Sequence, residues 1–250
     1  MCTLTYLPRP DASSSWLGRL AFNRDELLSR GPETPPMLRR AGDQAALWPL
    51  DSTSGGTWIG VNERGVAAFL LNANPPEPAH PTPTHSRGEL VPLVLAAMDV
   101  ATAEAAVRAA VQDGVYPWFR LVLVGDEMAC VLRHLPGGLE RRPLVLGASW
   151  LLTSSSLGDE LVRSPREALY AEMQHTASTA AERLQAQRAY HAHSWPGRGE
   201  LSVNMRRSDA ATRSYCEIDL HADRVCLRYQ PTPPPYEPSG GVWTLPRVRD

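Results

Sequence analysis

Short runs of alternating apolar and polar residues are interrupted by helix-like regions, and this order limits the fold more than any other feature of the chain. Strand patterns come first, helices follow, further strands and one long helix come next, and strands return near the end. Such an order predicts an α+β protein with enough strands for two sheets. The expected strands cover residues 2–7, 18–22, 57–61, 66–71, 119–124, 128–133, 201–205, 214–220 and 225–229, and the expected helices cover residues 89–98, 102–112 and 164–190.

Two kinds of local signal set the expected element boundaries. Ser164, Pro165 and Glu167 have the spacing of an N-cap serine, a first-turn proline and a capping-box glutamate, so a helix should begin there. A proline-rich connection is expected at residues 32–36, and a proline-rich tail that cannot pair centrally in a sheet from about residue 231. No internal repeat or linker is visible, and the 43% apolar content supports a sizeable core, so one domain over residues 1–250 is predicted.

All 25 basic side chains are arginine, and the 250 residues include no lysine. Enzymes that form a Schiff base on lysine, such as pyridoxal-phosphate enzymes and class I aldolases, are therefore excluded. The lysines of Walker A motifs and of kinase ATP sites are absent too, which excludes the usual phosphoryl-transfer sites. An arginine-biased genome accounts for the absence, and its chemical consequences hold whatever the cause.

Charge and cysteine usage narrow the class further. The net charge of −2 gives no electrostatic reason to expect a nucleic-acid partner. No apolar run of about 18 residues is present to span a membrane, and the first residues lack the basic and apolar regions of a signal peptide. The four cysteines form no C-x-x-C pair, which argues against a zinc ribbon or a thioredoxin motif. We expect a cytoplasmic protein of a reducing compartment.

Histidine and serine patterns offer no strong alternative site. His191 and His193 would share a face only in a strand, and they stand at an expected helix end with no carboxylate or thiol nearby in sequence. A solvated helix end, and no metal site, is therefore expected. No G-x-S-x-G elbow is present, which disfavours a serine nucleophile.

Cys2 directly follows the initiator methionine. Methionine is removed efficiently before a small residue such as cysteine, and its removal would expose an α-amine and a thiol on the same residue. With pKa values of roughly 8 and 8.5, the amine can take the proton of its own side chain, and the thiolate can attack an amide carbonyl. The ammonium can then protonate the leaving nitrogen. Taken alone, the position also fits a small residue that begins an edge strand.

Cys2 followed by Asn23-Arg24-Asp25-Glu26 resembles the NRDE family, also called the transport and Golgi organisation family, which has an N-terminal-nucleophile hydrolase-like fold. The resemblance extends over about residues 2–230 and implies a four-layer αββα sandwich. Further motifs of the family follow in order: Arg30, then Gly55-Gly56-Thr57-Trp58-Ile59-Gly60-Val61 with Gly65, then Asn72, then Ser86-Arg87-Gly88-Glu89-Leu90-Val91, and finally Asp209-Ala210-Ala211-Thr212-Arg213-Ser214.

The resemblance also implies roles for particular residues. Asp25 suits an α-ammonium as partner, although a loop-capping aspartate is as common; in the related penicillin V acylases and bile-salt hydrolases an aspartate at the matching place orients the nucleophile. Asn72 offers a neutral amide for an oxyanion hole, or caps a turn. Arg213 holds anionic charge near the nucleophile, pairs with Asp25, or is an ordinary sheet-surface arginine. The expected substrate contacts are Asn23, Arg24, Trp58 and Ser154.

Two departures from the related enzymes concern this site. The acylases carry R-N-x-D before the aspartate, whereas this chain has Phe22 at the arginine position and Arg24 two residues later. Both positions share one face of a strand, but their reach to the nucleophile differs. Many family members have Ser-Asn where this chain has Thr153-Ser154, and a hydroxyl would serve an oxyanion hole less well than an amide. Retention of Met1 would block the α-amine mechanism.

The sequence therefore predicts a cysteine hydrolase that acts on a non-peptide carbon–nitrogen (amide) bond of a small or acyl-chain substrate and requires no cofactor. Its expected catalytic residues are Cys2, Asp25, Asn72 and Arg213. The alternative is a non-catalytic protein that binds haem, an acyl lipid or acyl-CoA in the same pocket, because the family has been linked to haem mobilisation and acyl-lipid metabolism and a cysteine can ligate haem iron. A scaffold or trafficking role without a ligand is the third hypothesis.

Overall fold

Two antiparallel sheets face each other in the computed structural model, which describes residues 2–11, 13–75, 82–232 and 240–249. The first sheet has the described strands in the order β10 (Trp150–Ser154), β1 (Cys2–Pro8), β2 (Trp16–Leu27), β11 (Ala210–His221), β12 (Arg224–Pro231) and β13 (Gly241–Pro246). The second sheet has the order β3 (Glu33–Ala41), β4 (Gln44–Asp51), β5 (Ile59–Asn62), β6 (Ala67–Asn72), β7 (Phe119–Val124), β8 (Ala129–Leu135) and β9 (Gly138–Leu144).

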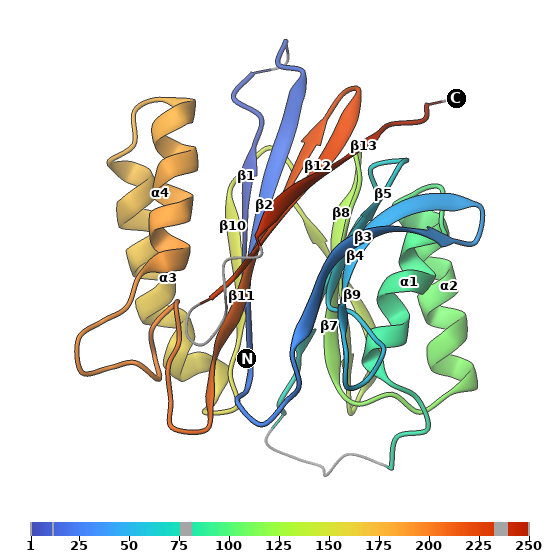
Figure 1. The fold of residues 1–250 in the computed structure, drawn as a ribbon, viewed down its shortest axis with the longest axis horizontal. Coiled ribbons are helices and arrows are strands. Elements are labelled where there is room, and N and C mark those ends of the chain that lie inside the picture. The colour runs from blue at the N-terminus through green and yellow to red at the C-terminus, as the bar shows by residue number, and fades with distance from the viewer. Residues whose placement is uncertain (1, 12, 76–81, 233–239, 250) are drawn as a thin grey trace.

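Helices cover the outer faces of both sheets (Figure 1). A short 3₁₀ turn, η1 (Arg87–Glu89), leads into α1 (Leu90–Leu95) and α2 (Val100–Asp113), which lie against the second sheet. On the other side, α3 (Asp159–His175) and α4 (Ala180–Ala192) lie against the first sheet. The four-layer αββα arrangement predicted from the sequence is confirmed. Among the described helices, none has both the length and the apolarity needed to cross a membrane.

Alternation along β1 shows how each layer is filled. Leu4 and Tyr6 belong to the large apolar cluster between the sheets, where Phe22 of β2 meets Phe69 of β6 at 6.1 Å between ring centroids. Leu7 points the opposite way and packs beneath the helices α3 and α4. Since successive residues of a strand face opposite sides, Cys2 shares the inter-sheet face with Leu4.

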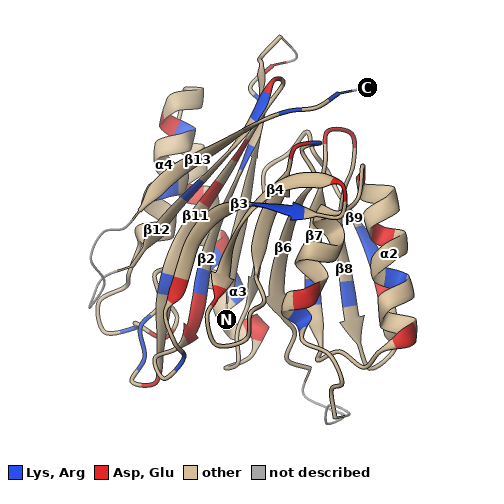
Figure 2. Ribbon diagram, turned by 45° about the vertical axis from the view of Figure 1, so that its right-hand side comes forward, with Lys and Arg blue, Asp and Glu red and all other residues tan. Residues whose placement is uncertain are grey.

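Strand β2 is longer than predicted. It was expected to end before the tetrapeptide, but it continues through Asn23–Glu26 to Leu27, paired with β1 on one side and β11 on the other. The tetrapeptide is therefore regular strand, and its neighbouring side chains point to opposite faces of the sheet. In Figure 2, basic and acidic positions lie close together on β2 and β11.

Five strands were not predicted: β3, β4, β9, β10 and β13. Pro35 and Pro36 of the expected connection lie inside β3, where the register shifts between Thr34 and Met37, and Pro32 lies just before the strand. A proline lacks the N–H of a ladder bond but is tolerated at a sheet edge or a bulge, and β3 is an edge strand. Residues 233–239 of the expected tail lie outside the described residues, and Gly241–Pro246 beyond them pairs with β12 as the edge strand β13.

The helix expected over residues 164–190 is wrong in extent, because two helices occupy this region. The first begins at Asp159, whose carboxylate accepts from the Ser155 N–H at 2.7 Å and pairs with Arg120. Pro165 consequently lies inside α3, not at its start. The capping box is found instead at α4, between Thr179 and Glu182. Residues 201–205, expected as a strand, form turns and bends.

Candidate active site

The pairing of β1 with its two neighbours places Cys2 in a row of polar side chains. Cys2 lies opposite Arg24 of β2 on one side and opposite Ser154 of β10 on the other. Its side chain is buried, at 6% exposure, but lines a small cleft of about 100 Å³ where the sheets separate. The cleft is lined by Cys2, Arg24, Asp25, Glu26, Arg30, Asp51, Ser54, Gly56, Thr57, Trp58, Leu70, Asn72, Ser86, Arg87 and Gly88.

The Cys2 thiol is neutral in this environment. Burial raises its pKa to about 11, and the nearby carboxylate of Asp25 acts in the same direction. The backbone N–H of Asp25 and the guanidinium of Arg24 act in the opposite direction and stabilise the thiolate once it forms. A base that removes the thiol proton is therefore needed for this cysteine to act as a nucleophile at neutral pH.

Asp25 is held in place from the neighbouring strand β11. Its Oδ1 accepts a hydrogen bond from Thr212 Oγ1 at 2.6 Å, and that hydroxyl in turn accepts from the Met205 N–H at 2.8 Å. The carboxyl group is 3% exposed, and burial raises its pKa although Arg166 and Thr212 oppose the shift. The β2–β11 register, which pairs Thr212 with Asp25, provides this orientation.

Arg24 lines the cleft and contacts three carboxylates. Its guanidinium donates to Glu33 at 2.6 Å and to Asp51 at 2.7 Å, and Glu26 lies at 3.2 Å. Its Cζ also lies 4.4 Å from the ring centroid of Trp58, within cation–π range. Although burial alone would lower its pKa, these three carboxylates raise the pKa of Arg24.

Two loops from the second sheet close the cleft at Gly56 and Gly88. A Cβ on either glycine would lie 2.9 Å from the Cα of the other, so only glycine allows the two backbones to cross. The Thr57 N–H donates to the Gly88 carbonyl at 3.2 Å and ties the loops together. This contact explains why glycines occur in both motifs, and it places the neighbouring Arg87 beside the cleft.

Five of the eight predicted site residues meet in this cleft: Cys2, Arg24, Asp25, Trp58 and Asn72. Asn72 ends β6 opposite Phe119, so its amide reaches the cleft from the second sheet. Ser154 pairs with Cys2 but is fully buried and does not line the cleft, and its Oγ has no hydrogen-bond partner among the described residues.

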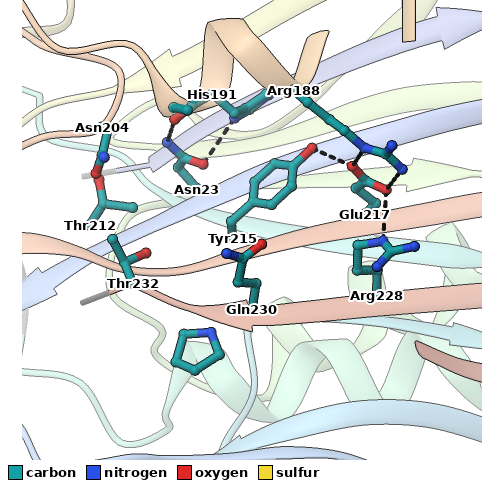
Figure 3. Close-up of a pocket in the computed structure, with 12 residues that line it drawn as sticks. Asn23, Arg188, His191, Asn204, Thr212, Tyr215, Glu217, Arg228, Gln230 and Thr232 are labelled. Atoms are coloured by element: carbon teal, nitrogen blue, oxygen red, sulfur yellow. Dashed lines mark hydrogen bonds and ion pairs between the residues drawn. The ribbon is translucent and has the colours of Figure 1, made fainter. Parts of the chain in front are cut away.

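Asn23 lies on the opposite face of the sheet, contrary to expectation. Its Nδ2 donates to the carbonyls of His191 and Val203, both at 2.9 Å, so it fastens the end of α4 (Figure 3). His191 itself is buried and not a solvated helix end as expected: its ring contacts Thr5 at 2.8 Å and Asn23 at 3.0 Å. Among the described residues no cluster of His, Cys, Asp or Glu could hold a metal.

The cavity beside Asn23, about 490 Å³ in volume, is larger than the cleft at Cys2, but the charged side chains that line it form ion pairs with one another. Its buried carboxylate, Glu217, accepts hydrogen bonds from Nε and Nη2 of Arg188 at 2.5 and 2.8 Å and from the Tyr215 hydroxyl at 2.7 Å (Figure 3). Arg228 lies 3.3 Å from the same group. This arrangement anchors α4 to the sheet and offers no nucleophile.

Arg213 occupies the bulge of β11, where the register with β2 shifts between Thr212 and Ser214. Its Nη1 lies 3.4 Å from the carbonyls of Leu27 and Leu28, and it does not line the cleft.

Sequence reasoning did not assign site roles to four charged residues that line the cleft: Glu26, Arg30, Asp51 and Arg87. Glu26, Arg30 and Arg87 belong to motifs of the family, and these motifs could have indicated that they lie at the site. No sequence signal pointed to Asp51. Its role arises because β4 ends there beside Arg24 and Arg30, whose guanidinium groups lie 2.7 and 2.6 Å from its carboxylate.

Solved structures with a similar architecture include an acylase, a bile acid hydrolase and an acid amidase. Penicillin V acylase from Agrobacterium tumefaciens superposes with a TM-score of 0.55 at 15% identity, covering 98% of this chain and 86% of that one. A variant of conjugated bile acid hydrolase from Clostridium perfringens gives 0.56 at 12% identity, over 98% and 92%. The N-acylethanolamine-hydrolyzing acid amidase ortholog of Caenorhabditis elegans gives 0.52 at 10% identity, over 87% and 92%.

At such low identity these likenesses establish the fold, which is that of the N-terminal-nucleophile hydrolases. No curated protein matches the chain by sequence. The family model for Transport and Golgi organisation 2 matches residues 1–141, which include the cysteine, the tetrapeptide and both glycine-containing loops of the cleft. The chain therefore belongs to the Transport and Golgi organisation 2 family.

Proposed function

We propose that the protein is a cysteine hydrolase that cleaves the amide bond of a small or acyl-chain substrate at Cys2. The observation that carries this proposal is the convergence of Cys2, Asp25 and Asn72, from three strands of two sheets, on one cleft. The N-terminal-nucleophile fold supports the reaction class, since the similar solved structures are amide hydrolases.

The mechanism requires removal of Met1. The α-amine of Cys2 then takes the thiol proton, and the thiolate attacks the amide carbonyl carbon to form a tetrahedral oxyanion. The resulting ammonium returns the proton to the amide nitrogen, the carbon–nitrogen bond breaks, and the amine leaves a thioester on Cys2. Water, deprotonated by the same α-amine, attacks the thioester; the carboxylic acid departs and the thiol is regenerated.

The other cleft residues assist these reaction steps through their charge and their orientation. Asp25, fixed by Thr212, is placed to hold the α-ammonium near the thiol. The side-chain amide of Asn72 is a neutral donor for the oxyanion, and such a donor contributes on the order of 10²-fold or more to the rate. Arg24 favours the thiolate that attacks.

The binding hypothesis, in which Cys2 ligates haem or the pocket holds an acyl lipid, uses the same cleft. The cleft is small, at about 100 Å³ against about 490 Å³ for the cavity beside Asn23. This size favours the head of a small amide over a macrocycle. A haem titration tests the alternative: it predicts a Soret shift that disappears in Cys2→Ala.

The absence of lysine gives the hydrolase proposal a direct test. Once Met1 is removed, the α-amine of Cys2 is the single aliphatic amine in the printed sequence. Intact-mass analysis first shows whether Cys2 is the N-terminal residue. Acetylation with an N-hydroxysuccinimide ester should then add one group at that amine and abolish hydrolysis of a panel of acyl amides, as should the substitution Cys2→Ala.

Two results would refute the mechanism. One is a mature protein that keeps Met1 and still hydrolyses amides. The other is complete acetylation of the α-amine with activity intact. Cys2→Ser serves as the matched control, because it keeps the α-amine and its acetylation while replacing the thiol by a weaker nucleophile.

A further inference from the structure

Arg87 differs from the other two arginines of the cleft in having no acidic partner. Arg24 and Arg30 both bind Asp51, at 2.7 and 2.6 Å. Arg87 donates from Nη1 to the Trp118 carbonyl at 2.9 Å, and no carboxylate of the described residues lies within 4 Å of its guanidinium nitrogens. Among the described residues of the cleft it is the arginine without an ion pair.

This charge is also partly withdrawn from water. Arg87 is half-buried, and burial lowers its pKa, while the proximity of Cys2 and Glu26 acts in the opposite direction. A desolvated guanidinium without a counter-ion is unfavourable, and an anion brought by a ligand would relieve that penalty.

The turn that carries Arg87 is fixed rather than adaptable. Ser86 Oγ accepts the Gly88 N–H at 3.2 Å, and Glu89 accepts the Ser86 N–H at 3.2 Å, so both halves of a capping box are made. The Gly56–Gly88 crossing holds the same turn against the second sheet. A ligand bound at such a pre-formed turn does not have to order it, which lowers the cost of binding.

We propose that Arg87 binds a carboxylate of the substrate, so that the site selects amides that carry a single negative charge close to the scissile bond. This inference rests on the proposed hydrolase function. One uncompensated cation matches one negative charge, and the planar guanidinium fork matches a carboxylate. Because Cys2 and Arg87 line the same small cleft, only a few atoms can separate the carbonyl from the carboxylate, as in an N-acyl α-amino acid.

A competing role for Arg87 is stabilisation of the oxyanion, which every amide substrate would share. Matched substrates separate the two roles. N-decanoylglycine and N-decanoylglycinamide have the same acyl chain and the same scissile bond, and they differ in the terminal group, which is an anionic carboxylate in the first and a neutral carboxamide in the second. A carboxylate-binding Arg87 affects only the first compound, whereas an oxyanion-stabilising Arg87 affects both equally.

The binding experiment uses Cys2→Ala protein, which keeps the cleft but cannot turn over either probe. Calorimetric titration should show N-decanoylglycine bound at least about tenfold more tightly than the glycinamide, as expected for one charge-assisted hydrogen-bonded contact. Arg87→Gln in this background should remove the preference. Arg108→Gln, a substitution on α2 outside the cleft, should keep it. Thermal unfolding checks that both variants fold.

Equal affinity for the two probes, no binding of N-decanoylglycine at millimolar concentration, or a preference that persists in Arg87→Gln overturns the carboxylate site. In protein with intact Cys2, an equal fall in kcat/KM for both probes on Arg87→Gln also overturns it. Hydrolysis of both probes without preference supports the hydrolase function and refutes the carboxylate site at Arg87. Preferential binding without hydrolysis of either probe refutes the hydrolase function and leaves the carboxylate site.

Discussion

Cys2 and Arg24 lie directly opposite each other on β1 and β2, so the thiol and the guanidinium share the inter-sheet face of one sheet. The thiol is neutral there, whereas the guanidinium is bound by Glu33, Glu26 and Asp51. Arg24 therefore mainly stabilises the cleft through its ion pairs with these carboxylates, and its positive charge also favours the thiolate form of Cys2. The nucleophile depends on this ion-pair cluster for its position as well as its charge.

Replacement of Arg24 by methionine should destabilise the protein strongly. The substitution leaves the buried Glu33 without its ion-pair partner and Asp51 with Arg30 alone, and breaking a buried pair in this way costs about 3–5 kcal/mol. Urea unfolding of Arg24→Met should show this loss in the free energy of unfolding. Arg108→Met is the control, because the Arg108–Glu104 pair is more exposed and should contribute about 0–1 kcal/mol. Equal effects of the two substitutions would contradict the cluster's role.

The crossing of the two cleft loops predicts the effect of Gly88→Ala. The new Cβ would lie 2.9 Å from the Gly56 Cα, so the backbones must separate, at an expected cost of about 1–3 kcal/mol. Turnover should fall as well, because the turn carrying Arg87 moves with Gly88. Gly137→Ala, whose Cβ would meet nothing within 4 Å, should change neither thermal stability nor kcat/KM. Wild-type activity in Gly88→Ala would show that the crossing does not position the site.

The sequence predicted the layers of the fold and most of the cleft for identifiable reasons. Alternation located β1 and the hairpin of β5 and β6, and the motif order placed Cys2, Asp25 and Asn72 together. Strand β3 was missed because its prolines were interpreted as a connection, although an edge strand tolerates them. These errors concern tertiary pairing, which a local pattern does not contain.

The position of Asn23 also depends on tertiary pairing that the local sequence pattern does not contain. Its place in the tetrapeptide suggested a substrate contact, but the strand continues through it and turns its amide towards α4. The length of β2 decided this outcome, and that length depends on pairing with β11, almost two hundred residues later in the chain. Asp51 was missed for a similar reason, since only the packing of β4 brings it to Arg24.

The buried His191 predicts a pH dependence of stability. Burial lowers its pKa to about 3, so between about pH 3 and 6.5 the unfolded chain binds a proton that the folded chain does not. The free energy of unfolding should therefore fall as pH drops through this window, by up to about 1.4 kcal/mol per unit from this group. His191→Gln should reduce the slope measured by urea unfolding between about pH 5 and 7. The exposed His175→Gln should not, and an unchanged slope in His191→Gln would contradict the assignment.

The hydroxyls of Ser154 and Thr153 should contribute differently to stability. Its Oγ is fully buried without a hydrogen-bond partner among the described residues, so Ser154→Ala should leave the free energy of unfolding unchanged or raise it by up to about 1 kcal/mol. Because Ser154 does not line the cleft, Ser154→Ala should also leave kcat/KM unchanged. The neighbouring Thr153→Val gives the opposite expectation for stability: Thr153 Oγ1 donates to the Cys2 carbonyl and accepts from Arg166, and its loss should cost about 1–3 kcal/mol. A fall in kcat/KM for Ser154→Ala at unchanged stability would contradict this expectation and would show that the buried hydroxyl acts on Cys2, its neighbour across the strand pair.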